Sequence, residues 1–225
     1  MKSDKVNANK RLKVFFDTEF TGLRKDTDIM SIGFITEDGR TFYAEFTDYD
    51  PKKLNAWLID NIVSKMKYVN SGYEEIKNYS PSKNEYVGDK KYVADNLKLW
   101  LTSLYNNVEF ENCLEMWSDC LAYDWVLFCD LFGGARSIPK SIYYIPFDIC
   151  TLMPMAGIDP DITRDSLSKT TKTLQRHNAL GDARMIKVWY HVCMSELFIK
   201  GINIEYTPHT SAKVYSTISP NIGAE

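Results

Sequence analysis

Five residues of this chain have the types and the spacing of a hydrolytic metal site. Asp17 and Glu19 lie in the segment KVFFDTEFTGL, Asp124 lies in MWSDCLAYDW, and His177 and Asp182 lie in RHNALGDAR. Residues two apart on a β-strand face the same side, so a strand here places the first two carboxylates side by side. At ~4 Å and an effective dielectric of about 20, such a pair repels by roughly 4 kcal/mol. Protons or divalent cations must therefore neutralise the group.

The donor chemistry favours two magnesium or manganese ions. Carboxylate oxygens are hard ligands, which suit Mg2+ and Mn2+ better than Zn2+. Two ions about 3.5 to 4 Å apart can activate a water on one side of a phosphodiester and stabilise the leaving oxygen on the other. His177 lies five residues before Asp182. Its imidazole, with an ordinary pKa of about 6.5, suits a general base that takes a proton from the attacking water.

Each of these residues also has a simpler explanation. An Asp-x-Glu pair on a strand is most often a solvated edge, and Asp124 and Asp182 fit first-turn acids that the helix dipole favours. A single histidine in the position of His177 is more often a helix cap or a surface residue. The segment FFDTEF, however, has hydrophobic neighbours, where unpaired charge is disfavoured. The catalytic interpretation depends on all five residues occurring together.

The composition predicts one domain without a membrane partner. The 225 residues are 44% hydrophobic, and we expect a single domain over 1–225, with its core at about 12–204 and an extended tail at 205–225. The formal charge of -3 excludes a global basic field, so a polyanion would be bound through local basic residues and cations. Five cysteines without a Cys-x-x-Cys motif predict reduced thiols and a cytoplasmic protein. Apolar runs stay below ~18 residues, and the N-terminus lacks a secretory pattern.

The first half of the chain predicts a strand meander followed by two helices. Short β-branched and aromatic runs predict strands at 13–19, 29–36 and 41–47, and Glu-Asp-Gly-Arg between the last two indicates an antiparallel hairpin. Apolar residues at helical spacing predict helices within 51–66 and 93–104. We expect the polar residues between these helices, 67–91, to form a surface insertion.

The second half predicts further strands and helices. We expect a strand at 113–117, a helix at 122–132 ended by Gly133 and Gly134, a strand running into a short helix at 143–153, and a helix at 178–198. The fold class is therefore α/β, a mixed sheet with its first three strands antiparallel and with flanking helices. Four tryptophans have core-like spacing and are expected to pack inside: Trp57, Trp100, Trp117 and Trp189.

The motifs themselves resemble a known family. FDTEFTGL, SDCLAYDW and HNALGDA resemble the three exonuclease motifs of the DEDDh 3'-5' exonucleases, which have the RNase H-like fold of RNase T and oligoribonuclease. A closer likeness covers most of the chain: it resembles the compact bacterial and phage 3'-5' exoribonucleases of the RNase T-like group, including those named polyadenylate-specific 3'-exoribonuclease. That likeness rests on FDTEF, SIGFITEDGRTFYAEFTDYDP, LNAWLIDNIV, LAYDWVLFCDLFG, FDICTLM and HNALGDAR.

The resemblance implies a role for each candidate residue. Asp17, Glu19, Asp124 and Asp182 would be metal ligands, and His177 would be the general base.

It also implies substrate contacts around the first motif. Thr18, Phe20 and Leu23 would contact the substrate, and stacking of an aromatic ring on a terminal base contributes about 1 to 3 kcal/mol. Core packing is the alternative for Phe20 and Leu23. Three basic residues after Gly157 either contact phosphates or belong to a solvated loop: Lys169, Lys172 and Arg176. Asp119 departs from the family pattern, because many relatives have Asn or Gly there; this departure affects the implied local polar contacts and not the implied ligand set.

The implied activity is metal-dependent hydrolysis of RNA, single-stranded or at an overhang, stepwise from its 3' end to nucleoside 5'-monophosphates. The alternative enzyme is a DNA 3'-5' exonuclease of the trimming or proofreading type, because the motifs recognise phosphate and metal rather than the 2'-OH. The alternative outside the enzymes is a nucleic-acid-binding module on the same fold, which loss of a ligand would indicate, and all five residues are present. The oligomeric state stays open, with a homodimer among the alternatives.

Overall fold

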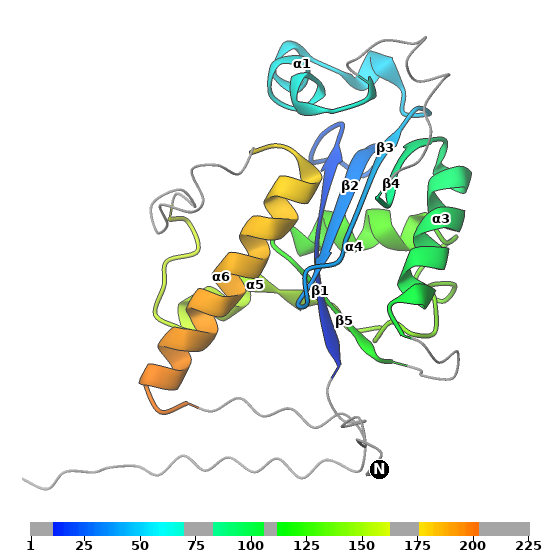
Figure 1. Ribbon diagram of the computed structural model, residues 1–225. Coiled ribbons are helices and arrows are strands. Elements are labelled where there is room, and N and C mark those ends of the chain that lie inside the picture. The colour runs from blue at the N-terminus through cyan, green and yellow to red at the C-terminus, as the bar shows by residue number, and fades with distance from the viewer. Residues whose placement is uncertain (1–10, 70–82, 106–111, 163–175, 203–225) are drawn as a thin grey trace, which may run out of the picture.

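A six-stranded mixed sheet forms the centre of the molecule (Figure 1). The computed structural model describes residues 11–69, 83–105, 112–162 and 176–202. The strand order is β4-β3-β2-β1-β5-β6. The strands are β1 (Leu12–Phe20), β2 (Ile29–Thr36), β3 (Thr41–Phe46), β4 (Glu85–Gly88), β5 (Leu114–Ser118) and β6 (Phe147–Asp148). β1, β2 and β3 pair antiparallel, and the remaining pairs are parallel, which confirms the predicted α/β class.

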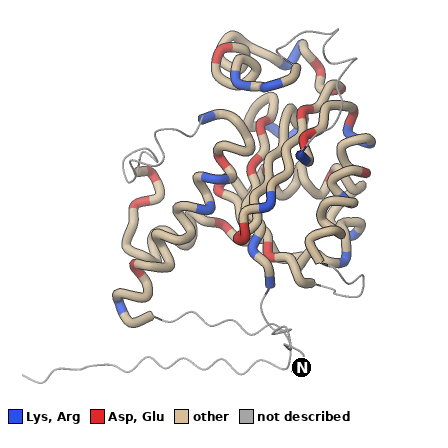
Figure 2. Tube along the Cα trace, in the orientation of Figure 1, with Lys and Arg blue, Asp and Glu red and all other residues tan. Residues whose placement is uncertain are grey.

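Helices cover both faces of this sheet. On one face, α5 (Ile149–Met155) and α6 (Ala179–Ile199) share a hydrophobic cluster with β1 and β5. On the other face, α3 (Lys90–Ser103) and α4 (Leu121–Asp130) pack on the strands in a second cluster. α1 (Ala56–Asn61) lies beyond one end of the sheet (Figure 1). Figure 2 shows Lys and Arg, like Asp and Glu, scattered over several elements.

Alternation along β1 sends its side chains into these two layers. Phe16 packs with α3 and α4, whereas Phe15 packs with α5 and α6. Asp17 and Glu19 follow Phe15 at the two-residue period and so lie on the α6 face. Thr18 lies on the α4 face. The strand thus presents both carboxylates to α6, the helix that carries Asp182.

The ends of α4 and α6 follow from their sequences. Gly133 and Gly134 end α4 with φ angles of 81° and 113°, a left-handed backbone that favours glycine. Asn178 caps the start of α6, and its side-chain oxygen accepts a hydrogen bond from the backbone N–H of Gly181 at 3.2 Å. Both helices therefore begin or end where the sequence predicts, within one or two residues.

Gly33 allows the start of α6 to approach the sheet closely. It lies on β2 directly opposite Asp17. A Cβ atom at Gly33 would come closer than 3.0 Å to backbone atoms of Ala179 and Leu180. Because the obstacle is backbone rather than a flexible side chain, any larger residue must displace the first turn of α6.

Replacing Gly33 by Ala is therefore expected to destabilise the protein by about 1 to 3 kcal/mol, as overpacking does elsewhere. Urea unfolding followed by circular dichroism measures this change. The matched control is Ser31→Ala on the same strand, because the buried hydroxyl of Ser31 has no hydrogen-bond partner among the described residues. A Gly33→Ala variant as stable as this control would contradict the close approach.

The segment 51–66 differs from the prediction of one amphipathic helix. Two 3-10 turns, Pro51–Lys53 and Val63–Lys65, flank the six-residue α1. Leu58 packs against Met30 in a small separate cluster. Trp57 is 55% exposed, so its predicted burial was wrong. A six-residue helix that contacts the sheet on one side buries one face, so Trp57, which directly precedes the buried Leu58, points away from that face.

The predicted insertion at 67–91 is also partly structured. Glu85–Gly88 forms β4, which extends the sheet beside β3, and α3 begins at Lys90. The backbone polar groups of β3 otherwise lack partners at this edge, and β4 supplies them. Residues 70–82 of the insertion lie outside the described residues.

Several smaller predictions can be compared directly. The other three tryptophans are buried as predicted: Trp100, Trp117 and Trp189. The five cysteines are free, and two of them, Cys129 and Cys193, are buried. Lys169, Lys172 and the tail at 205–225 lie outside the described residues. In the part of the chain that the structure describes, no helix has the length and apolar character needed to span a bilayer.

Candidate metal centre

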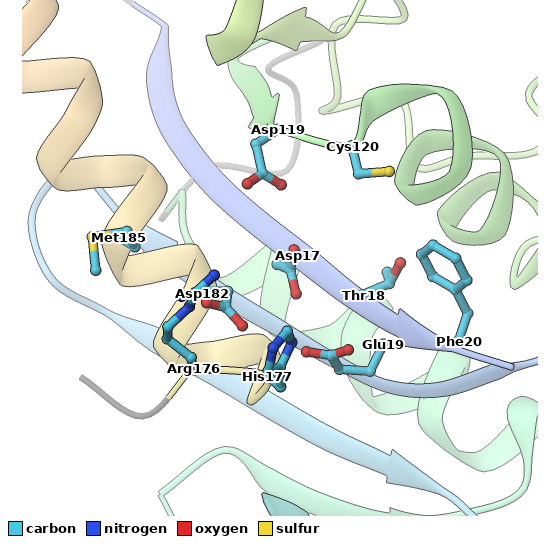
Figure 3. Close-up of a pocket in the computed structure, with 10 residues that line it drawn as sticks. All are labelled: Asp17, Thr18, Glu19, Phe20, Asp119, Cys120, Arg176, His177, Asp182 and Met185. Atoms are coloured by element: carbon cyan, nitrogen blue, oxygen red, sulfur yellow. The ribbon is translucent and has the colours of Figure 1, made fainter. Parts of the chain in front are cut away.

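A pocket of about 410 Å3 opens where β1 and β5 end. Its wall comes from the end of β1, the residues after β5 and the start of α6 (Figure 3). The lining residues are Asp17, Thr18, Glu19, Phe20, Asp119, Cys120, Arg176, His177, Asp182 and Met185. In α/β sheets, ligands bind at the carboxyl ends of strands, and this pocket has that position.

Two groups of three carboxylates share one residue in this region. Oxygens of Asp17, Glu19 and Asp182 lie within 4.8 Å of one another, and so do oxygens of Asp17, Asp119 and Asp124. Figure 3 shows Asp17, Glu19 and Asp182 converging beside His177, with Asp119 directed towards Asp17 from the other side. The structure thus brings together all four acidic residues that the sequence predicts and adds a fifth.

Asp124 lies behind the pocket wall and is held by hydrogen bonds. It is fully buried in the first turn of α4. Its Oδ1 accepts hydrogen bonds from the backbone N–H of Thr18 at 3.2 Å and from the Thr18 hydroxyl at 2.5 Å, and its Oδ2 accepts one from the Ser118 hydroxyl. Burial raises the pKa of Asp124 to about 6, although these hydrogen bonds lower it. The Thr18 hydroxyl therefore helps to hold the Asp124 carboxylate in place.

Charge repulsion and burial disfavour ionisation of the cluster. Burial, followed by the charges of Asp182 and Asp124, raises the pKa of Glu19 from its ordinary value of 4.5 to about 8. Asp17 and Glu19 are 8% and 9% exposed. A divalent cation fits such a set of converging oxygen donors, because it replaces the protons that the cluster otherwise retains.

We expect metal and pH to act together on stability. The folded protein binds more protons than the unfolded chain between the ordinary pKa of Glu19 and about 8, so without metal its stability should fall as pH rises through that window. Millimolar MgCl2 should raise the melting temperature, and more at pH 8 than at pH 6, because fewer protons compete. A ligand that binds only the folded protein, present at 100 times its Kd, adds about 2.7 kcal/mol to the free energy of unfolding.

Differential scanning fluorimetry measures both effects. Potassium chloride of matched ionic strength is the control for screening. The same shift with either salt, or no shift with magnesium at pH 8, would contradict a preformed cation site.

His177 lies in the turn directly before α6. Its φ angle is 58°, a left-handed conformation that histidine adopts more readily than most residues. Burial, followed by the positive charges of Arg176 and Lys65, lowers the pKa of His177 below its ordinary 6.5. The imidazole is consequently neutral at pH 7 and able to accept a proton. The ring of Trp57 packs edge-on against the imidazole of His177, with ring centroids 5.6 Å apart.

The two apolar residues that follow the acidic pair differ in position. Phe20 lines the pocket and stacks on Tyr123, with ring centroids 5.3 Å apart and an interplanar angle of 15°. It also packs against the hydrophobic core, as the core-packing alternative predicted, and its contact with substrate stays a prediction. Leu23 is 72% exposed and lies outside the pocket wall.

Sequence reasoning missed Asp119 in this site and the contact of Trp57 with His177 beside it. Asp119 directly follows β5, and a carboxylate at the carboxyl end of a buried strand is a signal that was available. Trp57 offers no such signal, because its contact with His177 joins residues 120 positions apart through the tertiary fold.

Comparison with known proteins places the chain in a family. A model of the Rv2179c-like 3'-5' exoribonuclease domain matches residues 12–194, a range that contains every residue of the pocket. The chain belongs to the Rv2179c-like 3'-5' exoribonuclease family. Two similar members are the 3'-5' exoribonucleases Rv2179c and MT2234.1 of two Mycobacterium tuberculosis strains. Each is 24% identical over 131 residues, which cover 58% of this chain and 67% of the relative.

A solved structure agrees with the fold of this Rv2179c-like family member. E. coli exonuclease I in complex with a dT13 oligonucleotide is similar with a TM-score of 0.51 and 13% sequence identity. The match covers 85% of this chain and 43% of the exonuclease chain, so this chain spans less than half of that protein. The likeness confirms the RNase H-like exonuclease fold.

Proposed function

We propose that this protein is a two-metal 3'-5' exoribonuclease of the DEDDh, RNase T-like type, which shortens RNA from its 3' end and releases nucleoside 5'-monophosphates. The observation that carries the proposal is the sharing of Asp17 by two carboxylate groups in a pocket that also contains His177. Membership of the Rv2179c-like family and the activity in its relatives' names support this reaction class.

The two carboxylate groups would each hold one Mg2+ or Mn2+ ion. Asp17, Glu19 and Asp182 would hold the first, and Asp17 and Asp124, with Asp119 beside them, would hold the second. Oxygen-only donors favour these ions. When bound, such ions activate a water and stabilise the leaving oxygen of a phosphodiester.

The remaining pocket residues would act directly on water and substrate. His177, neutral at pH 7, would take the proton of the attacking water. Phe20 would stack on the terminal base, with Thr18 as a further substrate contact, and Arg176 at the pocket wall would contact a phosphate. Leu23, exposed outside the pocket wall, would contact the substrate beyond the pocket. The substrate is a single-stranded RNA 3' end or overhang. The free cysteines fit a reducing, cytoplasmic environment.

Matched RNA and DNA oligomers of one sequence test the proposal. With a 5' label and Mg2+ or Mn2+, RNA should give a ladder that shortens from the 3' end, and mononucleotide 5'-phosphates should appear in solution. EDTA should stop the reaction, and circular single strands should be cut poorly. Efficient cutting of circles would contradict exonuclease action, and a higher rate on DNA than on RNA would favour the DNA exonuclease.

A further inference from the structure

A buried carboxylate outside the metal centre, that of Glu45 on β3, is surrounded by hydrogen-bond donors. Glu45 is fully buried. Its oxygens accept hydrogen bonds from the backbone N–H groups of three consecutive residues: Lys67, Tyr68 at 3.0 and 3.1 Å, and Val69 at 2.6 Å. The hydroxyl of Tyr43 donates a further bond at 2.7 Å. Burying a carboxylate is costly unless donors surround it, and here four groups do so.

This arrangement continues from Glu45 to the first turn of α6. The Tyr43 hydroxyl, which donates to Glu45, accepts a hydrogen bond from the side-chain amide of Asn178 at 3.4 Å. The same amide donates to the carbonyl of Lys65 at 3.4 Å, and the side-chain oxygen of Asn178 caps α6. A continuous path of hydrogen bonds therefore joins the segment 65–69, β3 and the start of α6.

The strand register explains why β3 reaches the catalytic helix. Asp17 pairs with Gly33, which pairs with Tyr43, and directly opposite residues share a face of the sheet. Tyr43 therefore lies on the α6 face, two strands from Asp17, and the start of α6 crosses Gly33 between them. Tyr43 also forms a buried cluster with Ala179 and Leu180. The start of α6 is fixed to β3 by both packing and hydrogen bonds.

The turn that this contact holds is the one that carries His177. His177 directly precedes Asn178 and has a φ angle of 58°. For a residue other than glycine, the left-handed backbone conformation is less favourable than the right-handed one. It persists where the surrounding structure holds it. Neither Tyr43 nor Glu45 lines the pocket, so neither is placed to touch substrate.

We propose that Glu45 and Tyr43 are positioning residues for the His177 turn: they hold the cap of α6 against β3 and thereby orient the imidazole in the pocket. The proposal rests on the proposed nuclease function, in which His177 accepts the proton of the attacking water. Loss of either residue should then slow the chemical step, whereas substrate and metal binding should change little.

Two variants test this, with one matched control. Glu45→Gln keeps the side-chain shape but replaces one acceptor by a donor, and Tyr43→Phe removes the bridging hydroxyl while leaving Glu45 with its three backbone donors. Each should lower kcat on RNA by about 10-fold or more, a size typical of supporting residues around an active site, with KM and the magnesium-induced melting shift within about 2-fold of wild type. The control is Glu115→Gln, another buried glutamate, whose carboxylate accepts from the Trp117 ring N–H at 2.7 Å on β5. It should leave kcat unchanged.

Coupling to His177 separates positioning from general loss of stability. In a His177→Ala background, Glu45→Gln should lower kcat by less than about 2-fold, because residues that act through one group are not additive. A full further loss in that background would overturn the proposal, as would a kcat equal to wild type in the single variants. If Glu45→Gln does not fold, Tyr43→Phe decides the question by the same two readouts.

Hydrogen exchange gives a readout that does not depend on activity. In both variants the amides of 177–183 should exchange faster than in wild type, and those of β1 and β2 should not change. Glu45→Gln should also accelerate exchange at 67–69. Unchanged exchange at 177–183 would overturn the positioning role even in an active enzyme. An inactive wild-type protein that shows these exchange changes would instead contradict the proposed function and leave the held turn supported.

Discussion

Asp17→Asn is expected to remove nuclease activity, with a loss of at least about 100-fold, because Asp17 belongs to both carboxylate groups. An amide cannot carry the charge that neutralises a divalent cation. Product formation from 5'-labelled RNA, measured across a magnesium titration, gives the magnitude. Excess metal should not restore the rate if both candidate sites are damaged.

The same variant should fold as well as wild type and be slightly more heat-stable without metal. Like charges ~4 Å apart repel by roughly 4 kcal/mol at an effective dielectric of about 20, and Asp17 lies close to the other carboxylates of both groups. The matched control is Asp130→Asn, an exposed aspartate at the end of α4. A variant of Asp17 that unfolds, or that cleaves RNA at the wild-type rate with magnesium, would refute the metal-site interpretation.

His177→Ala is expected to lower kcat by about 100-fold or more, the usual contribution of a general base. KM and the magnesium-induced melting shift should stay close to wild type, because the carboxylates that would hold metal are unchanged. Single-turnover cleavage of RNA measures the chemical step directly. The matched control is His191→Ala, an exposed histidine of α6 that lies outside the pocket.

The pH dependence gives an independent check on His177. Burial and the nearby positive charges of Arg176 and Lys65 lower the pKa of His177, so at saturating magnesium the wild-type rate should fall only at pH values below the ordinary histidine pKa of 6.5, as the imidazole protonates. The rate of His177→Ala should not show this fall at acid pH. An alanine variant with the wild-type rate and an unchanged profile would assign His177 a structural role.

The elements around the site were predictable because their signals are local. The β-branched and aromatic run in KVFFDTE, the glycines after α4 and the Asn178 cap each encode a feature within a few residues. Predictions failed where a long-range contact decided the outcome. β4 forms because β3 offers an unpaired edge, and Trp57 is exposed because the face of α1 that holds Leu58 packs on Met30.

The residues of the candidate site also divide into those predicted from the sequence and those found only in the tertiary structure. Asp17, Glu19, Asp124, His177 and Asp182 carry their chemistry in residue type and order, and the structure places them together. Asp119 escaped the prediction, since its approach to Asp17 depends on how β5 ends beside β1. Glu45 escaped it too, because its donors come from a segment more than twenty residues away along the chain.

The sequence by itself determined which residues carry acid, base and apolar character, and at what period, because those properties belong to side chains and to local backbone geometry. Only the tertiary structure decided that two carboxylate groups share Asp17, that Gly33 admits α6 against the sheet, and that Tyr43 and Glu45 reach the His177 turn. These depend on strand register and helix placement. Both arise from the packing of many residues at once, so no single stretch of the chain encodes them.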